Sequence, residues 1–233
     1  CDVFIYVGGE SDAWVADALK GAGNPDRTAI NLMEVLGDRA KEEEVVEGMQ
    51  EEDGHDGHDH EEQEELEYDV HMWLSLRNTQ VFCDAISEAL QAADPENAKL
   101  YQENTTAYKE KLAALDREYQ AAVDQSESKT LLFADRFPFR YAAFTGCSAE
   151  TDASVETITF LAGKLDELKL PVVFVIENSD GKVAKAVVEN TNTRDQKILT
   201  LNSMQSVTSD EINAGTTYLS IMKENLKTLK EAL

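Results

Sequence analysis

A stripe of seven side chains between residues 94 and 126 constrains the fold of this 233-residue chain more than any other feature. Its members recur at alternating spacings of four and three residues, and they are Tyr101, Thr105, Tyr108, Leu112, Leu115, Tyr119 and Ala122. Such spacing places the side chains on one face of an α-helix. Asp94-Pro95 is a strong helix start, because Asp caps a helix and Pro suits its first turn. The sequence therefore predicts one helix of about 30 residues, roughly 45 Å long at the usual rise per residue.

The chain alternates between strand and helix patterns on both sides of this helix. Strand-like runs occupy residues 2–7, 28–35, 130–134, 171–176 and 197–201. Helical patterns occupy a segment that Ser11 or Asp12 is expected to cap, a segment starting at Ser75, and residues 154–169, 181–190 and 215–232. Strands that alternate with helices favour parallel α/β sheets. We therefore predict two α/β lobes, residues 1–93 and 127–233, joined by a linking helix over residues 94–126.

An acidic segment within the first lobe carries most of the chain's charge. Residues 38–69 hold 16 acidic and 2 basic residues, so this segment contributes −14 to a net charge of −25. A charge of this sign repels nucleic acid and anionic membranes, and it concentrates cations. The segment is expected to be a solvated loop, loose from about residue 50 to residue 67.

All four histidines of the chain lie in or just after this acidic segment. His55, His58 and His60 lie inside it, and His71 begins the apolar stretch His71-Met-Trp-Leu. Imidazole is the commonest protein ligand for zinc and similar metals. The clustering therefore points to a transition metal.

Polar side chains follow the predicted strands at their carboxyl ends. Asp135, Glu177 and Asn202 follow the three strands of the second lobe, and Glu10 follows the first strand after Gly8-Gly9. Ligands of open α/β sheets bind beyond these strand ends. We expect the oxygen ligands to lie along one edge of the sheet and His71 to supply a nitrogen ligand from the other lobe. Together they predict a metal site in the cleft between the lobes.

Several other classes of protein are disfavoured. A serine or cysteine nucleophile needs a histidine base, and the histidines are confined to one short stretch, so we do not expect an enzyme. The chain has no GxxxxGK[ST], GxGxxG or HExxH motif. No apolar run approaches the ~20 residues of a membrane span. The cysteines Cys1, Cys83 and Cys147 form no CxxC motif and imply no disulfide framework.

Motifs spread in order over nearly the whole chain resemble the zinc-uptake substrate-binding lipoproteins of bacterial ABC importers. They are Phe4-Ile-Tyr-Val-Gly-Gly-Glu, the acidic His-rich loop, Asp69-Val-His-Met-Trp-Leu-Ser, the Asp94-Pro95 helix, Phe133-Ala-Asp-Arg-Phe-Pro-Phe-Arg-Tyr and Tyr218-Leu-Ser-Ile-Met-Lys-Glu-Asn-Leu. The resemblance implies two α/β lobes bridged by a rigid helix, with one metal ion in the cleft. It also implies a monomer that acts outside the cytoplasm, in the periplasm or as a cell-surface lipoprotein, with an ABC permease and its ATPase as partners.

The resemblance also implies a ligand set. The histidine of the family's D-x-H-x-W-L segment matches His71, Asp135 stands at the third ligand position, and Asn202 stands at the fourth. Glu177 and Glu10 are carboxylates expected to support these ligands or to replace one of them. The family's first ligand lies in an H-x-Y-x-P-like segment with no counterpart here. We therefore expect an incomplete first lobe, with Cys1 an ordinary residue at the head of an internal strand rather than a lipidated cysteine.

The expected ion is Zn²⁺, which favours tetrahedral nitrogen and oxygen sites, with Mn²⁺ as the alternative. We expect the loop histidines His55, His58 and His60 to bind zinc weakly and to gather it near the tight site. The expected function is zinc capture for an ABC importer. Alternatives are a manganese-binding protein of the same family, or a surface adhesin or metal-buffering protein without a role in transport.

Overall fold

The computed structural model describes residues 1–21, 23–24, 26–40, 69–134, 143–145 and 154–233. The chain divides into two compact units. Among the described residues, those up to Arg117 form unit 1 and those from Glu118 onward form unit 2. No described helix is long and apolar enough to cross a membrane.

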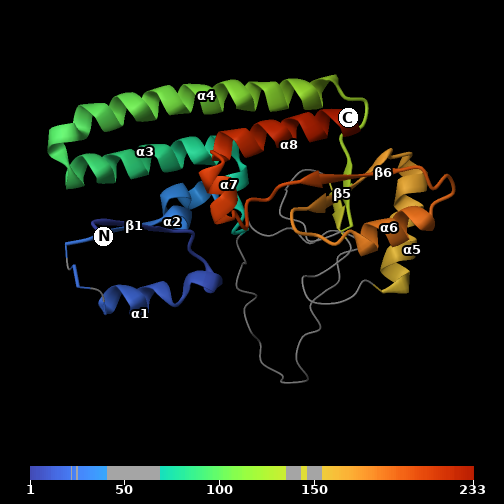
Figure 1. Ribbon diagram of the computed structural model, residues 1–233, viewed down its shortest axis with the longest axis horizontal. Coiled ribbons are helices and arrows are strands. Elements are labelled where there is room, and N and C mark those ends of the chain that lie inside the picture. The colour runs from blue at the N-terminus through green and yellow to red at the C-terminus, as the bar shows by residue number, and fades with distance from the viewer. Residues whose placement is uncertain (22, 25, 41–68, 135–142, 146–153) are drawn as a thin grey trace. The chain divides into compact units, whose positions relative to one another are not determined.

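Unit 1 is built on two parallel strands, β1 (Val3–Tyr6) and β2 (Thr28–Asn31), which pair with Tyr6 opposite Asn31. Its helices are α1 (Val15–Lys20), α2 (Leu32–Leu36), α3 (Leu76–Ala93) and the first part of α4 (Ala98–Gln125), with short 3₁₀ turns at Glu10–Asp12, Gly37–Arg39, Met72–Leu74 and Pro95–Asn97 (Figure 1). A hydrophobic cluster of Leu36, Met72 and Phe82 joins α2, the turn before α3, and α3 itself.

Two sequence expectations for unit 1 are wrong in detail. The strand expected over residues 28–35 ends at Asn31, because the Asn31 side chain accepts hydrogen bonds from the backbone nitrogens of Met33 and Glu34 and so caps α2. The first helix begins at Val15 without a side-chain cap. The Asp12 carboxylate instead accepts a hydrogen bond from the backbone nitrogen of Gly8, at 2.9 Å.

The long helix expected from the four-three spacing is confirmed as α4, which runs for 28 residues without a break. A short 3₁₀ turn precedes it, and Asp94 accepts hydrogen bonds there from Asn97 Nδ2 at 2.8 Å and from the Tyr101 hydroxyl at 2.9 Å. In unit 1, α4 lies beside α3 (Figure 1). Leu112 and Leu115 of the predicted stripe are buried.

Unit 2 contains a four-stranded parallel sheet in the order β4-β3-β5-β6. Its strands are β3 (Leu131–Phe133), β4 (Ala143–Thr145), β5 (Val172–Ile176) and β6 (Lys197–Leu201). Three of these strands confirm the expected apolar runs, whereas β4 was not predicted, because three residues carry no readable periodicity.

Both faces of the β5 region are buried, as expected for a parallel sheet covered on two sides. Val173 and Val175 of β5 join a cluster with residues of α5 (Val155–Leu168) and α6 (Lys182–Glu189). Val172 and Phe174 point to the opposite face, where their cluster includes Ala232 of α8 (Tyr218–Ala232).

The closing helix expected over residues 215–232 starts later, at Tyr218. Thr217 and Ser220 form a capping box that fixes this start. A separate short helix, α7 (Ser209–Asn213), precedes it, and a second capping box formed by Thr208 and Glu211 begins that helix.

Candidate metal centre

The carboxyl ends of β1 and β2 lie side by side in unit 1, and a two-glycine loop follows β1. Gly8 has φ +94°, and a Cβ atom there would lie 2.3 Å from Asn31 Oδ1. Gly9 has φ +82°, and its Cβ would lie 3.2 Å from Val70 Cγ1. Glycine is therefore needed at position 8 for both conformation and space. The loop that leads into Glu10 thus passes directly against the segment that leads into His71.

The His71 imidazole is held by a carboxylate two residues earlier in the chain. His71 Nδ1 lies 3.0 Å from Asp69 Oδ1, and the same oxygen accepts the backbone N–H of His71 at 2.9 Å. When Nδ1 of the neutral ring carries the proton, it can donate to this carboxylate, and the lone pair is then on Nε2. Metal-binding histidines are commonly oriented by this kind of contact.

The turn after His71 is anchored in the core of unit 1. The side chain of Met72 is buried against Leu36 and Phe82. Thr79 Oγ1 donates to the carbonyl of Trp73 at 3.2 Å, and the Trp73 ring lies 5.4 Å from the His71 ring. His71 therefore sits on a turn with little freedom to move, as a binding residue on a rigid element requires.

The expected residues Glu177 and Asn202 lie together in unit 2, because Ile176 of β5 pairs with Leu201 of β6. Glu177 is engaged with the loop after β6. Its carboxylate accepts hydrogen bonds from the backbone nitrogen of Ser203 at 2.6 Å, from the Ser203 hydroxyl at 2.8 Å and from the backbone nitrogen of Gln205 at 3.0 Å. Both carboxylate oxygens thus hold the loop in place.

Asn202 is held by its own loop and by α8. Its Oδ1 accepts the backbone N–H of Met204 at 2.8 Å. Its backbone N–H donates to Asn225 Oδ1, and its carbonyl accepts from Asn225 Nδ2, both at 2.8 Å. Asn225 is only 4% exposed. Met204 adopts a left-handed conformation, with φ +58°, which the surrounding hydrogen bonds support.

Sequence reasoning missed the partners Ser203, Gln205 and Asn225. Gln205 uses only its backbone nitrogen, which leaves no trace in the sequence, and Ser203 adds a hydroxyl of a kind common in loops. Asn225 did leave one, because it lies three residues after buried Met222 and next to buried Leu226, on the apolar face of α8. A polar residue on such a face needs a specific partner.

The remaining expected ligands, Asp135, His55, His58 and His60, lie outside the described residues. Within the part of the chain that the structure describes, no three His, Cys, Asp or Glu side chains are grouped so that they could hold a metal ion. The structure thus brings Glu177 and Asn202 together in unit 2 and sets the Glu10 loop beside the His71 segment in unit 1. The full ligand set stays a prediction.

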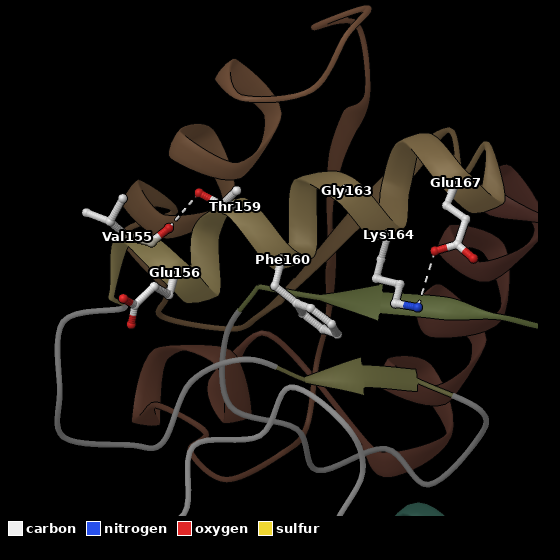
Figure 2. A pocket seen from close by; sticks show the side chains of 7 residues that line it. All are labelled: Val155, Glu156, Thr159, Phe160, Gly163, Lys164 and Glu167. Atoms are coloured by element: carbon white, nitrogen blue, oxygen red, sulfur yellow. Dashed lines mark hydrogen bonds and ion pairs between the residues drawn. The ribbon is translucent and has the colours of Figure 1, made fainter.

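A shallow pocket in unit 2 is separate from these residues. Its described lining comes entirely from α5, including Phe160, Lys164 and Glu167 (Figure 2). Lys164 lies over the Phe160 ring and forms an ion pair with Glu167 at 3.2 Å. Neither His71 nor Asn202 lines the pocket, and its side chains offer no arrangement of metal ligands.

Cys83 of α3 is a free, partly buried cysteine. Burial, followed by the nearby charge of Asp84, raises the pKa of the Cys83 thiol. The thiol is thereby kept protonated, and the protonated form is a poor metal ligand.

Comparisons with known proteins point to one family. The chain is 28% identical over 240 residues to the zinc-binding lipoprotein AdcA of Streptococcus pneumoniae serotype 4, covering 99% of this chain and 45% of that protein. It is 27% identical over 240 residues to the high-affinity zinc uptake system protein ZnuA of Bacillus subtilis, covering 100% of this chain and 72% of that protein. The chain therefore spans just under half the length of the streptococcal relative.

The fold is also shared with solved structures. The crystal structure of the Zn(II)-bound ZnuA-like domain of Streptococcus pneumoniae AdcA matches with a TM-score of 0.71 at 23% identity, covering 100% of this chain and 80% of that one. This likeness confirms the expected α/β fold. A family model for the periplasmic component A of the zinc-uptake complex matches residues 1–232. The chain belongs to that family, the periplasmic zinc-uptake component A proteins.

Proposed function

We propose that this chain captures Zn²⁺ outside the cytoplasm as the substrate-binding component of an ABC importer and delivers it to the importer's permease and ATPase. Family membership supports this proposal, and both relatives compared above carry zinc in their names. The same names favour zinc over manganese as the cargo. The observation that carries the proposal is the preset His71 imidazole, with its Nδ1 held by Asp69 at 3.0 Å.

The proposed ligands are those expected from the sequence, His71, Asp135 and Asn202. An imidazole with two oxygen ligands leaves a fourth position for water, which suits the tetrahedral preference of Zn²⁺. Because both oxygens of Glu177 already accept hydrogen bonds from the loop after β6, we assign Glu177 the task of shaping that loop rather than of binding zinc directly. Glu10 keeps its proposed place as a supporting carboxylate, on the loop that runs beside the His71 segment.

The acidic segment is proposed to gather zinc for this site. Its carboxylates raise the local concentration of cations, and His55, His58 and His60 supply weak, exchangeable ligands. Because the weak sites release zinc readily, they can supply it to the tight site without competing with that site.

Zinc titration of the intact chain against a chelator of known affinity, repeated with Mn²⁺, tests the proposal. The His71→Ala variant should lose the tight site, whereas the matched His58→Ala variant in the acidic segment should keep it. Tight zinc binding that is unchanged in His71→Ala would refute the assignment of His71. Tight Mn²⁺ binding with weak Zn²⁺ binding would refute zinc as the cargo.

A further inference from the structure

We infer that Asp69 is the positioning residue of this site: it fixes the tautomer and the ring orientation of His71 before any metal arrives. The inference rests on the proposed function, because it assumes that His71 is a zinc ligand. Its structural basis is that one oxygen, Asp69 Oδ1, meets two donors of the same residue, the backbone nitrogen of His71 at 2.9 Å and Nδ1 at 3.0 Å.

The two contacts have different consequences. The contact to the backbone nitrogen is an Asx turn, in which a short Asp side chain bonds the backbone two residues later. It fixes the backbone from Asp69 to His71. The contact to Nδ1 then fixes the ring relative to that backbone, so a single carboxylate oxygen restrains both the chain and the imidazole.

The contact to Nδ1 also selects a protonation pattern. The tautomer with its proton on Nε2 would turn the lone pair of Nδ1 toward a carboxylate oxygen, which is repulsive. The tautomer with its proton on Nδ1 forms a hydrogen bond to that oxygen and presents the lone pair on Nε2. A carboxylate in this role also raises the basicity of the ligating nitrogen.

The surroundings protect this arrangement from water and from rotation. The side chains of Asp69 and His71 are only 17% and 24% exposed. The Trp73 ring lies 5.4 Å from the imidazole, at an interplanar angle of 56°. A charge-assisted hydrogen bond in such a sheltered place is stronger than one in open water.

The test uses a variant in which His55, His58 and His60 are replaced by Asn, so that His71 is the only histidine left in the chain. Nitrogen NMR of its imidazole at fixed pH without zinc reports the tautomer, and chelator competition reports zinc affinity. We expect the Nδ1–H tautomer in this background. Asp69→Ala should lose that preference and weaken zinc binding about 10- to 100-fold.

Asp69→Asn separates geometry from charge, because its amide oxygen can still accept both hydrogen bonds. This variant should keep the tautomer and bind zinc more tightly than Asp69→Ala. The matched control is Asp116→Asn, which removes a carboxylate of the same unit that pairs with Arg77 at 3.0 Å. The control should change neither the tautomer nor the zinc affinity.

The outcomes separate this inference from the proposed function. An unchanged tautomer in Asp69→Ala overturns the inference, whether or not zinc affinity falls, because a loss of affinity alone would reflect general disruption of the turn. If the single-histidine background binds no zinc tightly, the proposed function fails. The NMR measurement would then still decide whether Asp69 sets the His71 tautomer.

Discussion

Asn225 holds the candidate ligand loop of unit 2 through two hydrogen bonds, and replacing it with Ala should loosen that loop. The Asn225 side chain donates to the Asn202 carbonyl and accepts from the Asn202 nitrogen, each at 2.8 Å. Asn225 itself is 4% exposed, so water does not readily take its place. The Asn225→Ala change therefore leaves two backbone groups without their partner.

The expected loss of stability follows from these contacts. A buried polar group left unsatisfied costs about 1–3 kcal/mol, and partial exposure of Asn202 favours the lower end for each of the two groups. Ala favours helix over Asn by roughly half a kcal/mol, which offsets part of the loss. The net destabilisation is about 1.5 kcal/mol, which corresponds to a fall in Tm of roughly 3–6 °C for a chain of this length.

Thermal unfolding followed by circular dichroism measures the global effect, and amide hydrogen exchange at Asn202 measures the local one. The matched control is Lys223→Ala on the exposed face of the same helix, which should stay within about 0.5 kcal/mol of the parent. If Asn225→Ala unfolds at the parent temperature and its Asn202 amide exchanges at the parent rate, the two hydrogen bonds do not hold the loop.

Three further results are expected. Burial raises the pKa of Tyr119, whose hydroxyl donates to the Met222 carbonyl at 2.7 Å, so its contribution to stability should be full below the unfolded tyrosine pKa of about 10 and fall at higher pH. In urea unfolding, Tyr119→Phe should lose about 1 kcal/mol at neutral pH and should show a smaller loss of stability at alkaline pH. Gly8→Ala should lower Tm by several degrees, since its φ is +94° and the new Cβ would clash with a side-chain oxygen, whereas Gly23→Ala, with open space around it, should not. Deleting residues 50–67 should remove the weak zinc sites in calorimetry and keep the tight one. Loss of the tight site would contradict the proposal that the acidic segment gathers zinc and does not form the tight site.

Much of the fold was predictable because a long periodic run still identifies its helix or strand when one residue in it departs from the pattern. The four-three stripe over α4 repeats enough times to exclude a strand, and the uninterrupted apolar run Val172–Ile176 can only be buried on both faces. The errors fall on short segments. The pattern over residues 28–35 predicts one strand, although Asn31 caps a helix in the middle of that run.

The neighbouring positions of Glu177 and Asn202 were predictable, but their contacts were not. The rule that ligands gather at strand ends correctly placed Glu177 and Asn202 next to each other, since it depends only on where β5 and β6 stop. Their hydrogen bonds depend on Ser203 and on Asn225, which is 23 residues beyond Asn202 in sequence. Pairing over such a distance is decided by how α8 packs on the sheet, which local patterns do not encode.

The contact between the His71 and Trp73 rings has an optical consequence. The chain contains two tryptophans, and Trp14 is 58% exposed, whereas the Trp73 indole lies 5.4 Å from the imidazole. An ion bound to that imidazole would place a divalent positive charge close to the indole and shift its emission through the local electric field. With Trp14 replaced by Phe, the tryptophan fluorescence of the unlabelled chain, excited where tyrosine does not absorb, would come from Trp73 and report on the occupancy of His71.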